Sequence, residues 1–155
     1  MDAGDRRKSR KNPFVVHYYQ NQHWGWRGNG MHRILIVDDE PNIVFAMELL
    51  MKREGYEVHT VDEGEKVFPA VREFKPDLIL LDIMLPKIDG YEVCQRIRSD
   101  AALKDIRIIM ITAKGRDVEK EKGLALGADY YITKPFSTRE VVMRVKEILA
   151  AGPER

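Results

Sequence analysis

The sequence predicts an α/β fold in which five parallel strands form a doubly wound sheet. Three observations support this prediction. From Arg33 to Ala150, short apolar runs alternate with longer amphipathic segments. Three of the short runs contain only apolar residues, which is typical of parallel strands covered by helices on both faces. Polar residues follow directly after several strands, where a doubly wound sheet forms its ligand site.

The expected strands and helices alternate along this part of the chain. The strands are expected at residues 34–37, 57–61, 78–81, 108–111 and 130–132. The helices are expected at residues 41–53, 65–74, 91–98, 117–126 and 139–149. In the first helix, Ile43, Met47 and Leu50 recur at the spacing of one helix face. This alternation implies right-handed crossovers between parallel strands.

Residues suited to helix ends support these boundaries. Pro41 suits the first turn of a helix, because an N–H group has no partner at that position. Gly55 and Gly127 suit the left-handed position that ends a helix. Ser137 is a good N-cap for the last helix, and Glu140 completes a capping box three residues later.

Charge divides the chain into a basic leader and a mildly acidic body. Residues 1–30 carry six Arg or Lys against two Asp, a charge of +4, and the whole chain carries +1, so the remainder sums to −3. The leader lacks periodicity and is expected to be disordered. Residues 31–150 then form one domain, and residues 151–155 form a short tail. Because Met31 directly precedes the first strand, a misassigned upstream start is a second hypothesis for the leader.

Composition excludes several classes of function. The acidic body lacks the clustered basic face that nucleic-acid binding needs, so this domain is not expected to bind DNA. Cys94 is the only cysteine, which excludes a disulfide or a Cys-based zinc site within one chain and agrees with a reducing, cytoplasmic location. Apolar runs such as residues 78–81 are far below the roughly 18 to 20 residues that span a bilayer, so no membrane span is expected.

Polar groups follow four of the expected strands. They are Asp38, Asp39 and Glu40 after the first strand, Asp82 after the third, Thr112 after the fourth, and Thr133, Lys134 and Pro135 after the fifth. Parallel strands end at the same edge of a sheet, so we expect these side chains to converge. A single Asp after a strand more often caps the next helix, and this interpretation is kept for Asp62 and Asp89.

Several carboxylates at one edge predict a bound cation. Asp38 and Asp39, close to Asp82, repel one another unless a cation neutralises them. Mg²⁺ prefers oxygen ligands and keeps several waters, which leaves room for a phosphate oxygen. A cation beside a lysine and a hydroxyl donor forms a cradle for phosphoryl transfer, in which a carboxylate can be the nucleophile. The sequence therefore predicts phosphorylation of Asp82 with the help of Mg²⁺.

These residues resemble the pattern of response-regulator receiver domains, the phosphoacceptors of two-component signalling. The matching positions are Asp38-Asp39, Asp82, Thr112 and Lys134-Pro135, within the stretches VDDEP, LLDIMLPKIDGYEVCQRIR, ITAK and GADYYITKPF. The resemblance covers residues 32 to about 150. It implies a flavodoxin-like (βα)5 receiver fold with strand order 2-1-3-4-5. A stand-alone, CheY-like receiver is expected, because no output domain follows residue 150.

The resemblance implies a role for each acidic residue of the site. Asp82 takes a phosphoryl group from a phosphohistidine on a sensor histidine kinase or a histidine phosphotransfer protein. Asp39, Asp82 and the backbone carbonyl of Met84 hold Mg²⁺ directly. Asp38 acts chiefly through a bound water. The receiver thus catalyses its own phosphorylation and dephosphorylation, and it is not expected to be a conventional enzyme.

The resemblance also implies a conformational switch. Lys134 pairs with Asp82 and then with the phosphoryl group, and Pro135 follows a peptide bond that is cis in the family. Thr112 donates its hydroxyl to the phosphoryl group, and this movement is coupled to inward packing of Tyr131. A half-buried strand aromatic is the alternative interpretation of Tyr131. Tyr130 is expected on the opposite face, closer to the core.

Two further features concern the output and the lifetime of the signal. Residues 117–149 form the surface that receivers commonly use for partner docking or for a phosphorylation-dependent homodimer. Met84 and Lys114 flank the site and lack the acidic or amide group that would orient an attacking water. Self-dephosphorylation is therefore expected to be slower than in a receiver with Asn and Glu at these two positions. The cognate kinase, the downstream target and the pathway stay open.

Three other functions compete with this interpretation. A haloacid-dehalogenase-like phosphatase would need a second Asp two residues after its nucleophile, where this chain has Met84. A dinucleotide-binding domain would need a Gly-x-Gly-x-x-Gly motif after the first strand, which is absent. A pseudo-receiver scaffold that binds partners without phosphorylation is the remaining alternative.

Overall fold

The computed structural model describes residues 30–151. The leader predicted at residues 1–30 and the tail predicted at residues 151–155 therefore lie outside the described residues, apart from Gly30 and Ala151. The described part is built around one parallel sheet of five strands, in the order β2-β1-β3-β4-β5. This is the predicted strand order of the flavodoxin-like receiver fold, and the prediction is confirmed.

Strands and helices alternate as the sequence predicts. The strands are β1 (Arg33–Val37), β2 (Glu57–Val61), β3 (Leu78–Leu81), β4 (Arg107–Thr112) and β5 (Tyr130–Thr133). The helices are α2 (Pro41–Arg53), α3 (Val67–Phe74), α4 (Gly90–Ser99), α5 (Asp117–Ala125) and α6 (Thr138–Ala150). One helix differs from the prediction at its start, because residues expected at its N-terminus form a 3-10 turn, η2 (Gly64–Lys66).

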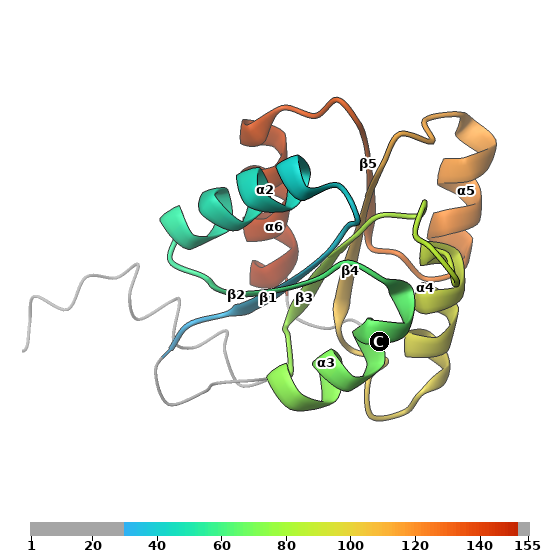
Figure 1. Ribbon diagram of the computed structural model, residues 1–155, viewed down its shortest axis with the longest axis horizontal. Coiled ribbons are helices and arrows are strands. Elements are labelled where there is room, and N and C mark those ends of the chain that lie inside the picture. The colour runs from blue at the N-terminus through green and yellow to red at the C-terminus, as the bar shows by residue number, and fades with distance from the viewer. Residues whose placement is uncertain (1–29, 152–155) are drawn as a thin grey trace, which may run out of the picture.

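The helices cover both faces of the sheet (Figure 1). Between the helices and the sheet lie two apolar layers. One layer lies under α2 and α6, and it contains Ile34, Ile36 and the buried side chains of those two helices. The other layer contains Leu35 and Val37 and lies under α3 and α4. Successive residues of a strand point to opposite faces, so β1 contributes to both layers. The continuous apolar runs of β1, β3 and β4 are buried, as the sequence predicts.

The ends of the helices follow the predicted signals in all but one case. Gly55 and Gly127 have positive φ angles of 89° and 108°, which a side chain would disfavour. The Asp89 side chain accepts a hydrogen bond from the backbone of α4 and so caps that helix. The Asp62 prediction is wrong: its carboxylate instead accepts a hydrogen bond from Lys66 Nζ at 2.7 Å. Asp62 therefore forms an exposed ion pair with Lys66 and does not cap a helix.

Arg98 joins three segments at the end of the sheet opposite to the strand-end residues. Its guanidinium donates hydrogen bonds to the carbonyl oxygens of Gly127, Lys104 and Ile106 at 2.8, 3.0 and 2.6 Å. It also pairs with Asp129 Oδ2 at 3.0 Å. The side chain therefore ties α4 to the loop before β4 and to the start of β5.

No helix within residues 30–151 combines the length and the apolar character needed to cross a bilayer.

Candidate functional site

The register of the sheet brings strand-end residues together at its carboxyl edge. Val37 pairs with Leu81 across β1 and β3, so the residues that follow them, Asp38 and Asp82, are neighbours although 44 positions separate them. The N–H group of Asp82 donates to the carbonyl of Val37 at 2.9 Å, which extends the ladder by one residue. Parallel pairing therefore fixes the backbone positions of both acids.

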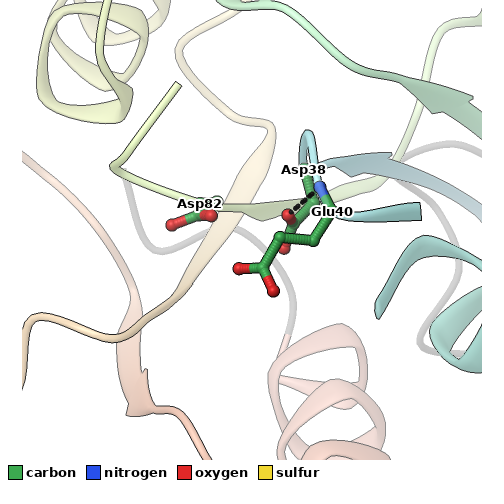
Figure 2. Close-up of side chains that lie close together, drawn as sticks. All are labelled: Asp38, Glu40 and Asp82. Carbon is green, nitrogen blue, oxygen red and sulfur yellow. Dashed lines mark hydrogen bonds between the residues drawn. The ribbon is translucent and has the colours of Figure 1, made fainter. Parts of the chain in front are cut away.

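Three carboxylates form a cluster at this edge, which we call the acidic cluster: Asp38, Glu40 and Asp82. Their ligand atoms all lie within 4.8 Å of one another (Figure 2). Asp38 and Asp82 are buried, with 1% and 3% of their surface exposed, whereas Glu40 is exposed. The predicted pair of Asp38 and Asp82 is thus brought together. Asp39 is exposed and does not belong to the cluster.

Glu40 is the member of the cluster for which the sequence predicts no role in the site. It stands two positions after Asp38, and alternate residues of an extended chain point to the same side. Its backbone is extended, and its N–H group donates to Asp38 Oδ1 at 2.9 Å. The spacing in VDDEP therefore could have predicted that Asp38 and Glu40 point to the same side and Asp39 to the other.

Lys134 lies among these carboxylates. Its ammonium nitrogen is 2.8 Å from Asp38 Oδ2, 2.9 Å from Glu40 Oε1 and 3.2 Å from Asp82 Oδ2. The following peptide bond, Lys134–Pro135, is cis, in agreement with the resemblance. Lys134 is 96, 94 and 52 positions from Asp38, Glu40 and Asp82, so the folded sheet assembles the site from distant parts of the chain.

Burial and charge act in opposite directions on the groups of the site. Burial raises the pKa of Asp38, and the hydrogen bonds from Lys134 and from the N–H group of Glu40 offset this only in part. Burial lowers the pKa of Lys134, but the hydrogen bonds to Asp38 and Glu40 and the charge of Asp82 outweigh burial, so the net shift is upward. Lys134 is therefore a cation at neutral pH.

The loop after Asp82 is folded tightly against it. The N–H group of Met84 donates to Asp82 Oδ1 at 3.2 Å, while the Met84 side chain is 55% exposed. Gly90 approaches so closely that a Cβ atom there would lie 2.7 Å from the Cα atom of Ile83. Each oxygen of the Asp82 carboxylate thus has a hydrogen-bond donor, one from this loop and one from Lys134.

Thr112 and Tyr131 lie on adjacent strands next to the acidic cluster. Thr112 is fully buried, and its Oγ1 accepts a hydrogen bond from the N–H group of Lys114 at 3.4 Å. The hydroxyl of Tyr131 donates to the carbonyl oxygen of Lys114. The Tyr131 ring therefore packs inward, and burial raises the pKa of its hydroxyl.

Of the two tyrosines of β5, Tyr131 is the more buried, whereas the sequence predicts Tyr130 to be closer to the core. Tyr131 is buried, 8% exposed, in the layer that contains Met110, and α5 approaches it through Gly123, where a Cβ atom would lie 3.1 Å from the ring. Tyr130 is half-buried, and the guanidinium of Arg144 lies 4.6 Å from the centre of its ring. The alternative of a half-buried Tyr131 is thereby wrong, because the missing side chain of Gly123 lets α5 cover the ring.

Comparisons with known proteins agree with this geometry. The family model of the response regulator receiver domain matches residues 34–146. The alkaline phosphatase synthesis transcriptional regulatory protein PhoP of Bacillus subtilis is 50% identical over 117 residues. That match covers 76% of this chain and 48% of PhoP, so the chain spans about half the length of this curated relative.

Solved structures show the same fold. A response regulator of Chloroflexus aurantiacus is 40% identical, with a TM-score of 0.74 over 77% of this chain and 98% of that chain. The BeF3-activated N-terminal receiver domain of RstA from Klebsiella pneumoniae is 27% identical, with a TM-score of 0.72 over 76% and 98% of the two chains. With the family model matching most of the described residues, the chain belongs to the response regulator receiver domain family.

Proposed function

We propose that this receiver takes a phosphoryl group onto Asp82 in a Mg²⁺-dependent reaction and thereby changes its surface for a partner. The observation that carries the proposal is the position of the Asp82 carboxylate, 3% exposed, at the carboxyl edge of the sheet, with Lys134 Nζ at 3.2 Å. A buried carboxylate beside a fixed cation is a suitable nucleophile for phosphoryl transfer.

The donor set fits a hard divalent cation. Asp38, Glu40 and Asp82 offer carboxylate oxygens within 4.8 Å of one another, and oxygen ligands are what Mg²⁺ prefers. By the family resemblance, Asp38, Asp39, Asp82 and the backbone carbonyl of Met84 would hold the ion. When bound, Mg²⁺ would neutralise negative charge on the phosphoryl oxygens.

The side chains of this chain supply the remaining parts of the reaction. An oxygen of Asp82 forms a bond to phosphorus while the bond from phosphorus to the donor histidine nitrogen breaks, and the electron pair stays on that nitrogen. Lys134 donates to a phosphoryl oxygen, and the hydroxyl of Thr112 donates to another. No general base is needed, because the Asp82 nucleophile is already a carboxylate.

The proposed readout is the surface formed by α5, β5 and α6. Thr112 and Tyr131 both hydrogen-bond to the backbone of Lys114, in the loop that leads into α5. Movement of Thr112 toward a phosphoryl group would therefore displace the loop at Lys114, to which Tyr131 is also hydrogen-bonded. A sensor histidine kinase or a histidine phosphotransfer protein is the proposed cytoplasmic phosphodonor, and a downstream protein or a second copy of the chain is the proposed recipient.

Phosphorylation with a small donor tests this function. Incubation of the full chain with Mg²⁺ and acetyl phosphate should add one phosphoryl mass, measured by intact mass spectrometry, and EDTA should prevent it. Asp82→Asn should abolish the addition, whereas Asp62→Asn, which changes an exposed acid outside the site, should leave it intact. A wild-type chain that takes up no phosphoryl group would favour the pseudo-receiver scaffold.

A further inference from the structure

The N-cap residue of α2 does not cap its helix. Glu40 precedes Pro41 in an extended conformation, with φ −88° and ψ 108°, and its side chain makes no capping hydrogen bond. Its carboxylate instead accepts a hydrogen bond from Lys134 at 2.9 Å, across 94 positions of sequence. Figure 2 shows this side chain extending toward Asp38 and Asp82. Glu40 therefore serves the acidic cluster and not the helix.

The three N–H donors of Lys134 can all be satisfied by carboxylates. They are shared among Asp38, Glu40 and Asp82 at 2.8, 2.9 and 3.2 Å. Two of these acids are buried, but the side chain of Glu40 is 58% exposed. An exposed ion pair contributes little free energy, because water can solvate its carboxylate after separation. The N–H donor held by Glu40 is thus the one released at the lowest cost.

We propose that Glu40 is a positioning residue that holds Lys134 in the resting site and releases it to the phosphoryl group. This inference rests on the proposed phosphorylation of Asp82. When the phosphoryl group arrives, Lys134 exchanges its hydrogen bond with Glu40 for one with a phosphoryl oxygen. Glu40 then keeps its negative charge beside the new anion, which it repels.

The same charge has opposite effects on the two species that the site binds. A carboxylate close to the other two acids attracts a divalent cation and repels a phosphoryl group or its mimic. Loss of the charge should therefore weaken Mg²⁺ binding and strengthen anion binding. A residue with only a structural role would weaken both, because damage to the fold disturbs the whole site.

Glu40→Gln in the full chain tests the proposal. Isothermal titration calorimetry should show Mg²⁺ binding weakened about three- to tenfold. With Mg²⁺ saturating for each variant, beryllofluoride should bind about two- to fivefold more tightly. Glu40→Asp keeps the charge but shortens the reach to Lys134, so its Mg²⁺ affinity should stay within about twofold of wild type while beryllofluoride binding tightens.

Glu48→Gln is the matched control, because Glu48 lies on α2 and pairs with Lys52 away from the site. Both of its affinities should equal those of the wild type. If Glu40→Gln shifts both affinities in the same direction, or matches Glu48→Gln, the role of Glu40 is refuted. If the wild-type chain itself binds neither Mg²⁺ nor beryllofluoride, the proposed function fails, and with it the inference that rests on it.

Discussion

The hydroxyl of Tyr131 donates to the backbone carbonyl of Lys114, two residues after Thr112. Tyr131 thus holds the loop that leads from β4 into α5, and it does so from within the buried layer of the domain. A tyrosine that is both buried and hydrogen-bonded responds to pH in a way that an exposed tyrosine does not.

Alkaline pH should therefore destabilise the domain partly through Tyr131. Burial raises its pKa, and the neighbouring hydroxyl of Tyr91 raises it further. In the unfolded chain a tyrosine ionises near pH 10. Above about pH 10 the folded state then retains a proton that the unfolded state has lost, so this residue lowers the free energy of unfolding as pH rises. Tyr131→Phe removes this contribution.

Urea unfolding from about pH 9 to about pH 11 measures the effect. We expect the free energy of unfolding to fall less steeply in Tyr131→Phe than in the wild type. Leu124→Ala is the control, because Leu124 is 48% exposed and carries no titratable group, so its slope should equal that of the wild type. Equal slopes in all three proteins would contradict the prediction.

Asp38→Asn should stabilise the domain in the absence of Mg²⁺. Burial raises the pKa of Asp38 despite its hydrogen bond from Lys134, so the charged carboxylate is less favourable in the folded than in the unfolded state. A raised carboxyl pKa means that stability falls as pH rises through the window between the unfolded and folded pKa values. Above that window the loss is complete, and the neutral Asn avoids it.

Melting temperatures with and without Mg²⁺ check this prediction. Asp38→Asn should melt above the wild type in EDTA and gain less from added Mg²⁺. Asp105→Asn, at an exposed position, should behave as the wild type does under both conditions. A lower melting temperature for Asp38→Asn in EDTA would show that Lys134 outweighs the burial of the charge.

Self-dephosphorylation should be slow and should accelerate when polar groups are introduced at the rim of the site. Met84 is 55% exposed and Lys114 is also exposed, and they lie two residues after Asp82 and Thr112, respectively. Neither can accept a proton from an attacking water. Met84→Asn combined with Lys114→Glu should raise the decay rate of the phosphoprotein about tenfold or more, because a positioned general acid or base typically contributes on the order of 10²- to 10⁴-fold. An unchanged decay rate in a time course by mass spectrometry would contradict this role.

Arg98→Ala should cost about 1 to 3 kcal/mol in the free energy of unfolding, because it leaves partly buried carbonyl oxygens without this donor. Since Arg98 lies at the far end of the sheet, Mg²⁺ affinity should be unchanged in the folded fraction. Arg98→Lys can restore only part of the stability, as an ammonium group cannot reach all four acceptors at once. Chemical unfolding of the two variants measures both effects. A loss below about 1 kcal/mol in Arg98→Ala would show that water replaces the guanidinium.

Much of the fold and part of the site follow from the sequence for identifiable reasons. The apolar runs at residues 34–37, 78–81 and 108–111 predict buried parallel strands, and parallel strands must present Asp38 and Asp82 at one edge. The pairing of Asp82 with Lys134 was also predicted, but only through the resemblance to a family.

The remaining details depend on side-chain packing. The Glu40–Lys134 pair joins residues 94 positions apart and depends on how far two long side chains reach, which strand periodicity does not encode. The predicted order of burial of Tyr130 and Tyr131 was wrong for a similar reason. Both faces of β5 are covered, so alternation cannot distinguish them, and the cover over Tyr131 comes from Gly123 on another element.

The sharing of one ammonium group by three carboxylates has a consequence for the fidelity of signalling. With one positive charge against three negative charges, the resting cluster carries a net charge of −2. Free phosphate and nucleotides, which are abundant anions in any cell, are repelled by this field. Without a bound cation the proposed site would therefore repel phosphate anions, and phosphoryl transfer would need the cation and the phosphodonor together.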